Sequence, residues 1–166
     1  MTRVVLIDGR SGSGKTTLAE QIAVELGADD SVAQTLHLDL LYPGWDGLAL
    51  GSLAVATALR EGGYHPYDWH AGQFMAGWIA LDPERPLVIE GCGALTEANL
   101  AAARAWASKL GVAEVRAIWL ECDKALRRER ALARDGEMFA PHWDEWAAQE
   151  AVHYALHKPW LHVRDP

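Results

Sequence analysis

Cysteine is scarce in this chain. Cys92 and Cys122 are the only two, and no short spacing motif pairs them. Two cysteines are too few for a cysteine-built metal site or for a disulfide framework. We therefore expect two reduced thiols in a cytoplasmic protein.

Long apolar runs and blocks of basic residues are also missing. No stretch approaches the ~20 apolar residues that a membrane-spanning helix needs, and the first residues carry no signal-peptide pattern. The formal net charge is −8, and no Lys/Arg cluster offsets it. Such a chain is a poor match for a nucleic-acid binder. We expect neither a membrane nor a nucleic acid as a partner.

What is present is typical of one globular domain. The chain has 166 residues, half of them hydrophobic, which is enough for a full core and argues against disorder. No internal repeat, low-complexity tract or linker divides it. We expect a single domain over residues 1–166 that acts as a monomer or small homo-oligomer.

Residues 9–16 match the phosphate-binding pattern G-x-x-x-x-G-K-[ST] at every fixed position. In this pattern backbone N–H groups surround phosphate oxygens, the lysine adds positive charge and the hydroxyl can ligate Mg²⁺. The alternative is a fortuitous glycine-rich turn. The predicted nucleotide-binding residues are Gly9, Ser11, Gly12, Ser13, Gly14, Lys15, Thr16 and Thr17.

The flanking residues favour the phosphate loop. A short β-branched run at 3–8 precedes it and predicts a buried strand. Leu18, Ile22 and Leu26 follow at helical spacing, and Gly27 is a typical helix end. Strand, glycine loop and helix together indicate a nucleoside triphosphate site, occupied by ATP or another NTP.

Strand and helix patterns alternate along the chain, which predicts an α/β fold with a parallel sheet covered on both faces. Numbered along the sequence, the strands are expected at 3–8, 34–39, 86–91 and 114–120, with a weaker fifth at 161–163. Helices beyond the first are expected at about 52–61, 97–110, 123–134 and 143–157, with Leu100, Ala103, Ala107 and Leu110 forming an apolar stripe.

Acidic residues follow the predicted strands, where α/β folds bind ligands. Asp39 could accept a proton from a substrate hydroxyl or hold Mg²⁺ through water; it could also cap a turn. Glu90 has the position of a Mg²⁺-side carboxylate. For Glu121 and Asp123 we expect capping of the next helix.

Four arginines, Arg127, Arg128, Arg130 and Arg134, cluster before Asp135 and Gly136. Three of them share a helix face, and a helix of this kind running into a glycine-containing loop predicts a lid at about 127–141 that closes over the γ-phosphate. The alternative is a solvated surface whose arginines pair with Glu129 and Asp135.

Aromatic residues gather in two places. Residues 64–70, including Tyr67, Asp68 and Trp69, could contact a planar or polyhydroxylated substrate or could pack on the core. The last helix places Trp143, Trp146, Glu150 and Tyr154 on one face, a stripe more typical of core. Glu150 within it needs a buried partner. His153 and His157 lack a third ligand, so we discount a zinc site.

The chain resembles the uridine kinase-like P-loop kinases. The resemblance rests on residues 9–17, Asp39 with Tyr42, residues 66–69 and 89–91, and the arginine segment 127–135, in that order. It implies the three-layer P-loop fold of nucleoside-monophosphate-kinase type, with sheet order 2-3-1-4, and the use of ATP and Mg²⁺. Leu40 and the tryptophan-rich C-terminal region depart from the family pattern.

The resemblance also implies roles for single residues. Asp39 would be the base for the acceptor hydroxyl, Tyr67 and Asp68 would lie near a nucleoside, and Arg130 and Arg134 would contact phosphates. The predicted catalytic set is completed by Lys15. The substrate set comprises Asp39, Tyr42, Tyr67, Asp68, Trp69 and Glu90, and the metal set comprises Thr16, Glu90 and Asp39.

The predicted function is ATP- and Mg²⁺-dependent transfer of a γ-phosphate to a hydroxyl or phosphate of a small molecule. A nucleoside or nucleotide is the first candidate acceptor, and another small hydroxyl metabolite is the next. A nucleotide-dependent switch ATPase and a non-catalytic nucleotide binder remain as alternatives.

Overall fold

A four-stranded parallel sheet forms the centre of the protein. The computed structural model describes residues 4–27, 33–109, 111 and 114–163. The strands are β1 (Val4–Gly9), β2 (Gln34–His37), β7 (Leu87–Glu90) and β8 (Val115–Leu120). Their spatial order is β2-β7-β1-β8, and every neighbouring pair is parallel. This order confirms the predicted 2-3-1-4 arrangement.

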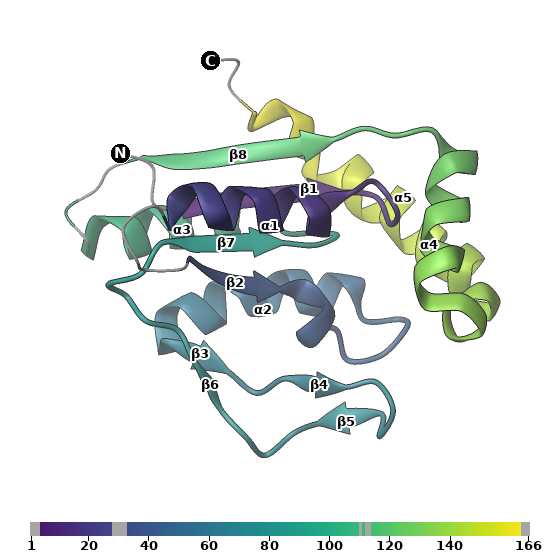
Figure 1. Cartoon of the computed structure of the whole chain (residues 1–166), viewed down its shortest axis with the longest axis horizontal. Helices are drawn as coiled ribbons and strands as arrows, with labels where there is room; N and C mark the ends of the chain where they lie inside the picture. The colour runs from purple at the N-terminus through teal and green to yellow at the C-terminus, as the bar shows by residue number, and fades with distance from the viewer. Residues whose placement is uncertain (1–3, 28–32, 110, 112–113, 164–166) are drawn as a thin grey trace.

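Helices cover both faces of the sheet. Helix α1 (Lys15–Leu26) lies on one face, and α2 (Leu48–Glu61) and α3 (Glu97–Lys109) lie on the other (Figure 1). Alternate residues of β1 pack on opposite faces of the sheet. Val5 and Ile7 pack with α1, whereas Val4 and Leu6 belong to the larger core cluster. A parallel strand buried on both faces has no polar alternation, which explains its apolar sequence.

Two further helices complete the fold at the carboxyl ends of the strands. These are α4 (Lys124–Phe139) and α5 (Trp143–His157), linked by the 3-10 turn η2 (Ala140–His142). Helix α5 has its predicted bounds, whereas α2 begins earlier and α4 ends later than predicted. Leu110 of the predicted apolar stripe lies outside the described residues. Among the described residues, no helix combines the length and apolar character needed to cross a membrane.

The aromatic segment 64–70, for which no strand was predicted, lies within a set of short strands. Strands β3 (Gly63–Tyr64) and β6 (Ile79–Ala80) pair antiparallel, and so do β4 (Tyr67–Asp68) and β5 (Gln73–Phe74). The two pairs form a ribbon beside the β2 edge of the molecule (Figure 1). The ribbon carries the predicted aromatic segment to the same end as α4.

Two predicted strand assignments are corrected. The weak fifth strand at 161–163 is wrong, because η3 (Pro159–Leu161) is a 3-10 turn and proline is well suited to the first position of a helical turn. The second strand ends at His37, since the chain enters the 3-10 helix η1 (Leu38–Leu40), in which the Leu41 N–H donates to the Leu38 carbonyl at 2.8 Å. Asp39 therefore lies on a helical turn.

Candidate active site

The glycine loop between β1 and α1 adopts a cradle conformation. Gly12 and Gly14 have φ values of 77° and 96°, in the left-handed region that favours glycine. Lys15, the first residue of α1, is buried and donates from Nζ to the Arg10 carbonyl at 3.0 Å. The lysine thus lies across the loop beside the helix N-terminus, where a phosphate is favoured by both backbone N–H groups and the helix dipole.

Helix α4 packs directly on this loop. A Cβ added at Gly12 would lie 2.1 Å from the Arg127 carbonyl oxygen. The Arg127 side chain is buried, with Nε donating to the Cys122 carbonyl at 3.1 Å and Nη1 to the Ser11 carbonyl at 3.2 Å. Arg127 therefore fixes α4 to the phosphate loop and does not share the environment of Arg130 and Arg134.

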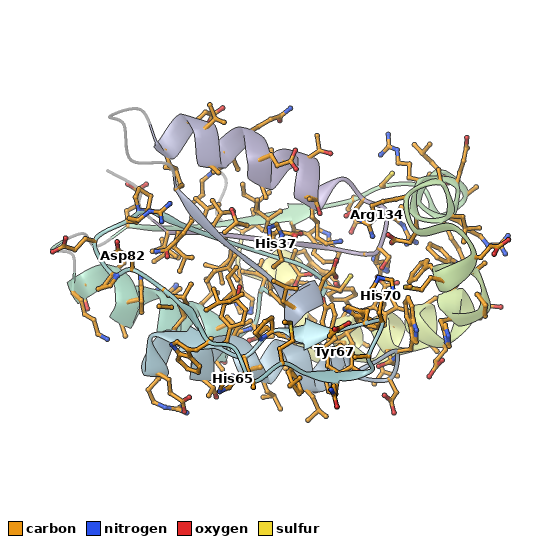
Figure 2. The ribbon with its side chains drawn as sticks, turned by 60° about the horizontal axis from the view of Figure 1, so that its bottom comes forward. His37, His65, Tyr67, His70, Asp82 and Arg134 are labelled. Carbon is orange, nitrogen blue, oxygen red and sulfur yellow. The ribbon has the colours of Figure 1, made fainter. Side chains whose placement is uncertain are left out.

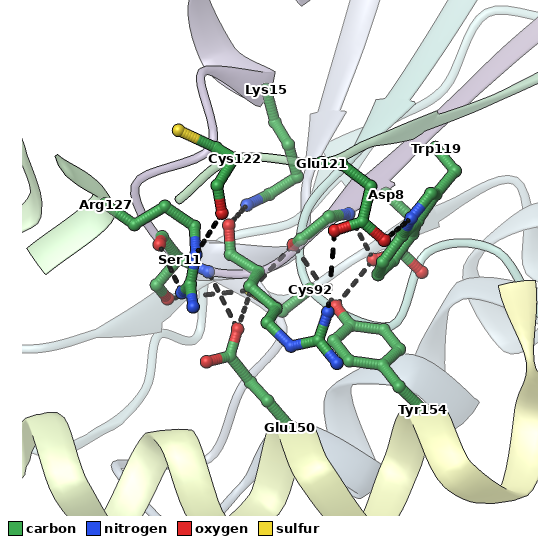
Figure 3. A network of polar contacts seen from close by, with 12 residues as sticks. Asp8, Ser11, Lys15, Cys92, Trp119, Glu121, Cys122, Arg127, Glu150 and Tyr154 are labelled. Atoms are coloured by element: carbon green, nitrogen blue, oxygen red, sulfur yellow. Dashed lines mark hydrogen bonds and ion pairs between the residues drawn. The ribbon is translucent and has the colours of Figure 1, made fainter. Parts of the chain in front are cut away.

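Asp8, near the end of β1, anchors the start of the loop (Figure 3). Its carboxylate accepts the N–H groups of Gly9 at 2.7 Å, Gly93 at 3.1 Å and Leu95 at 2.9 Å, and the Tyr154 hydroxyl at 2.7 Å. Burial raises the pKa of Asp8, and these hydrogen bonds oppose that rise. The end of β1 is consequently held by a fully satisfied buried carboxylate.

Glu150 of α5 is a second buried carboxylate under the loop (Figure 3). Its Oε2 accepts the Ser11 N–H at 2.7 Å and lies 3.6 Å from the Cys92 thiol. Burial raises the pKa of Glu150, while the Ser11 bond and the nearby Lys15 and Arg127 charges oppose the rise. The partner expected for a carboxylate within an aromatic stripe is therefore the phosphate loop itself.

Glu90 ends β7 beside the loop. Its Oε1 accepts from the Thr16 hydroxyl at 3.4 Å and lies 2.6 Å from His37 Nδ1. The hydrogen bond to Glu90 raises the pKa of His37, against the opposing effect of burial. Sequence reasoning missed His37, although its position in β2, two residues before Asp39, was a usable signal.

Asp39 faces the same space from η1. The residue is accessible to solvent, yet partial desolvation by its surroundings raises its pKa, and the Glu90 charge adds to this. The charges of Arg134 and Lys15 act in the opposite direction. A carboxyl with a raised pKa is better matched to proton transfer near neutral pH than an ordinary aspartate.

The phosphate loop, Glu90 and Asp39 line one cavity of about 510 Å³, a volume in the range of small-molecule sites. Its floor is the phosphate loop, its acidic residues end or follow β2 and β7, and its roof comes from α4. Predicted site residues in the lining are Ser11, Gly12, Gly14, Lys15, Thr16, Thr17, Asp39, Tyr42, Trp69, Glu90, Arg130 and Arg134.

Four predicted residues lie outside this lining and support it. Gly9 leaves room for the chain, because a Cβ there would meet Ser13 Oγ at 2.7 Å. Ser13 Oγ is buried and has no hydrogen-bond partner among the described residues. Asp68 accepts the N–H groups of the following turn, which lowers its pKa. Tyr67 packs edge-on against Trp69 at 5.3 Å between ring centroids.

Aromatic side chains form one wall of the cavity. Trp69 donates from Nε1 to the Asp39 carbonyl at 2.7 Å, which ties the β4–β5 ribbon to η1. Trp45 was not selected from the sequence. Its ring centroid lies 4.7 Å from that of Trp69, 5.2 Å from that of Phe139 and 4.5 Å from that of His142, whose ring is nearly parallel to it. We name this group, with Tyr42 and Trp146, the aromatic wall.

The arginines of α4 divide into fixed and exposed members. Arg134 forms two hydrogen bonds with Asp135, at 3.0 and 2.8 Å, and Arg130 lies 3.7 Å from the Cys122 sulfur; both arginines are exposed. Gly136, with φ 51° and ψ −129°, kinks the helix after them. Figure 2 shows Arg134 at the α4 end of the molecule, with His70 and Tyr67 below it and His37 nearer the centre.

The structure also tests the predictions for Asp123, Glu121 and the two cysteines. Asp123 caps α4, accepting the N–H groups of Ala125 and Leu126 at 2.9 and 3.2 Å, as expected. The same prediction for Glu121 is wrong, because its carboxylate lies 4.0 Å from Arg10 and accepts from Trp119 Nε1 instead of capping the helix. Both cysteines are free. Within the described part of the chain, no cluster of three or more His, Cys, Asp or Glu side chains could hold a metal ion.

Comparison with known proteins supports this fold. No protein-family model matches the chain, and no curated protein sequence matches it. Solved structures do match. One is a proposed fructose transport system kinase from Silicibacter sp. TM1040, with 20% identity and a TM-score of 0.53, covering 99% of this chain and 87% of that one.

A second solved structure is a possible uridine kinase from Bacillus stearothermophilus. It is 17% identical, has a TM-score of 0.56, and the match covers 98% of this chain and 86% of that one. At such identities the likeness shows the fold alone. The resemblance found in the sequence is thus confirmed at that level, and the chain has the three-layer α/β fold of the P-loop kinases.

Proposed function

We propose that this protein is a kinase that transfers the γ-phosphate of ATP to a hydroxyl of a small molecule. One observation carries the proposal: a single cavity of about 510 Å³ joins the phosphate loop, the carboxyl of Asp39 and the guanidinium groups of Arg130 and Arg134. Phosphoryl transfer needs a nucleotide cradle, a base for the acceptor and cations over the transferred group. Each has a candidate here.

The nucleotide end would work through Lys15, Thr16 and the loop N–H groups. Mg²⁺ suits the neighbouring donors, because the Thr16 hydroxyl and the Glu90 carboxylate are oxygen ligands 3.4 Å apart. A magnesium ion of this kind takes few protein ligands and completes its shell with phosphates and water. When bound, it would offset the negative charge of the phosphates.

The acceptor end would work through Asp39. The Asp39 carboxylate would take the proton of the attacking hydroxyl and become a carboxylic acid, and its raised pKa favours that role. Arg134 is close enough to Asp39 to influence this pKa and would, with Arg130, stabilise charge on the transferred phosphoryl group. Trp69 holds the backbone of Asp39 in place.

The aromatic wall indicates the class of acceptor. Tyr42, Trp45, Trp69, Phe139 and Trp146 line the cavity and offer flat apolar surfaces that suit a planar ring. Among the described residues that line it, the cations are Lys15, Arg130 and Arg134, and the proposal assigns all three to the phosphates of ATP. This favours a nucleoside over a nucleotide, with another small hydroxyl metabolite next.

The two similar structures are described as kinases for fructose transport and for uridine, so sugars and nucleosides both belong in the test. We propose a cytoplasmic enzyme, monomeric or a small homo-oligomer, that acts on free small molecules.

The test is incubation with Mg·ATP and a panel of nucleosides, nucleotides, sugars and other hydroxyl metabolites. ADP release and product mass are followed together. ADP that forms only with one acceptor, alongside a product heavier by one phosphate, would establish the kinase and its substrate class. ADP release that is the same with every acceptor would replace this proposal with a switch ATPase.

A further inference from the structure

Helix α5 touches both ends of the cavity through neighbouring residues. Glu150 contacts the phosphate loop, as described above, and Gln149 contacts the opposite side. The loop that Gln149 reaches, residues 43–47, runs between Tyr42 and α2 and carries Trp45 of the aromatic wall. Gln149 and Glu150 themselves belong to none of the predicted catalytic, nucleotide-binding, substrate or metal sets.

Gln149 uses both ends of its amide on this loop. Its Nε2 donates to the Trp45 carbonyl at 2.7 Å, and its Oε1 accepts the Leu48 N–H at 3.2 Å. Leu48 begins α2, so this N–H lacks a partner within its own helix. A glutamine is the residue type that can satisfy a carbonyl and an N–H with one side chain. Gln149 thereby holds this segment at Trp45 itself and at the start of α2.

Glu150 makes the corresponding contact on the nucleotide side. It is 2% exposed, and its Oε2 accepts the Ser11 N–H at 2.7 Å. One turn later, the Tyr154 hydroxyl lies 2.7 Å from Asp8 Oδ1 and 3.2 Å from the Gly9 carbonyl (Figure 3). One turn earlier, Trp146 packs edge-on against Tyr42 at 4.8 Å.

We propose that Gln149 and Glu150 are a pair of positioning residues, Gln149 for the acceptor and Glu150 for the nucleotide, through which α5 sets the separation of the two substrates. The proposal rests on the proposed kinase function. Transfer requires the acceptor oxygen and the γ-phosphorus to meet at about 3–3.5 Å, and small errors in placement are costly. Because Gln149 and Glu150 are consecutive residues of one helix, their two contacts keep the acceptor site and the nucleotide site at a fixed separation.

The two residues should therefore affect different substrates. Leaving a buried hydrogen-bonding group without its partner costs roughly 10–100-fold in an equilibrium constant. We expect Gln149→Leu to raise the KM for the acceptor ~10-fold while the Kd for ATP stays within about twofold. Glu150→Ala should weaken ATP binding ~10-fold, with the acceptor KM within about twofold. Val152→Ala, on the exposed face of α5, is the matched control and should change neither constant.

A conservative variant separates positioning from charge. Glu150→Gln keeps an oxygen that can accept the Ser11 N–H, so ATP affinity should stay within about threefold of the wild type. A tenfold loss in Glu150→Gln would assign the effect to the negative charge and overturn the proposed contact. If Glu150→Ala does not fold, Glu150→Gln and Gln149→Leu decide the question.

The experiment distinguishes failure of the proposed kinase function from failure of the proposed role of α5. ATP binding is measured at equilibrium without an acceptor, and acceptor KM is measured by phosphorylated product. A wild type that phosphorylates no acceptor would refute the kinase function. A working wild type whose Gln149→Leu and Glu150→Ala variants shift both constants equally, or shift neither, would refute the role of α5 and leave the kinase function standing.

Discussion

The two ends of the cavity are built in different ways. The nucleotide end is a continuous segment, residues 9–16, whose backbone is held by the buried carboxylates of Asp8 and Glu150. The acceptor end is assembled from the aromatic wall, η1 and exposed arginines of α4, brought from distant parts of the chain. A site made of backbone groups needs a fixed local conformation, whereas a site made of side chains depends on how the elements pack.

The largest expected loss comes from the nucleotide end. Lys15→Ala removes the cation that lies across the phosphate loop, and turnover should fall by about 10²–10³-fold, with weakened ATP binding. Steady-state kinetics and equilibrium nucleotide binding measure this. Wild-type behaviour in both assays would contradict the assignment of residues 9–16 to phosphate binding.

A variant of Asp39 tests whether activation of the acceptor can be lost while ATP binding is kept. Asp39→Asn keeps the size of the side chain and removes the proposed base, so kcat should fall by ~10²-fold while ATP binding stays intact. Single-turnover phosphotransfer and ATP binding would be measured side by side. If turnover is unchanged, Asp39 is not the base.

Arg134 should show a smaller effect because the residue is exposed and already paired with Asp135. Arg134→Ala should lower kcat by about 10-fold, with little change in protein stability. Arg128→Ala, from the same helix but absent from the cavity lining, is the control. Equal kinetics for the two variants would favour a solvated arginine surface over a lid.

His153 gives the smallest and most specific prediction, on stability. Burial and the neighbouring His157 lower the pKa of His153 to about 4. Between pH 6.5 and about 4 the unfolded chain therefore binds a proton that the folded chain does not, so stability falls as pH falls through this window and levels off below it.

Replacing His153 removes this sensitivity. His153 Nε2 is buried and has no hydrogen-bond partner among the described residues, so His153→Leu should fold and lose less stability on acidification. Relative to the wild type, the gain near pH 4 should be on the order of 2 kcal/mol. Chemical denaturation at several pH values measures it. Parallel curves for the two proteins would exclude His153 as the source.

The sequence predicted the nucleotide end better than the acceptor end. The glycine pattern and the apolar strands are local features, and they correctly indicated the parallel sheet, whereas its strand order followed from the family resemblance. The positions of Arg127, Arg130 and Arg134 share a helix face, yet only packing of α4 on Gly12 decides that Arg127 is buried and the others are exposed. No local pattern contains that information.

Long-range side-chain contacts were the main omission. Gln149 and Trp45 are 104 residues apart in the chain, and neither belongs to a motif. The ribbon of β3 to β6 was missed because pairs of two-residue strands are too short for a period-2 pattern. Tyr67 and Asp68 were selected as substrate contacts, but neither lines the cavity: Tyr67 packs edge-on against Trp69, and Asp68 accepts N–H groups of the turn that follows β4. Their direct contact with substrate stays a prediction.

The close approach of Gly12 to α4 has a consequence for finding relatives of this chain. The general phosphate-loop pattern leaves the fourth position open to any residue. Here a left-handed backbone and the Arg127 carbonyl oxygen, 2.1 Å from where a Cβ would lie, admit only glycine. A search for proteins that share this architecture should therefore use the stricter pattern G-x-x-G-x-G-K-[ST], which rejects loops that bind phosphate without a helix resting on them.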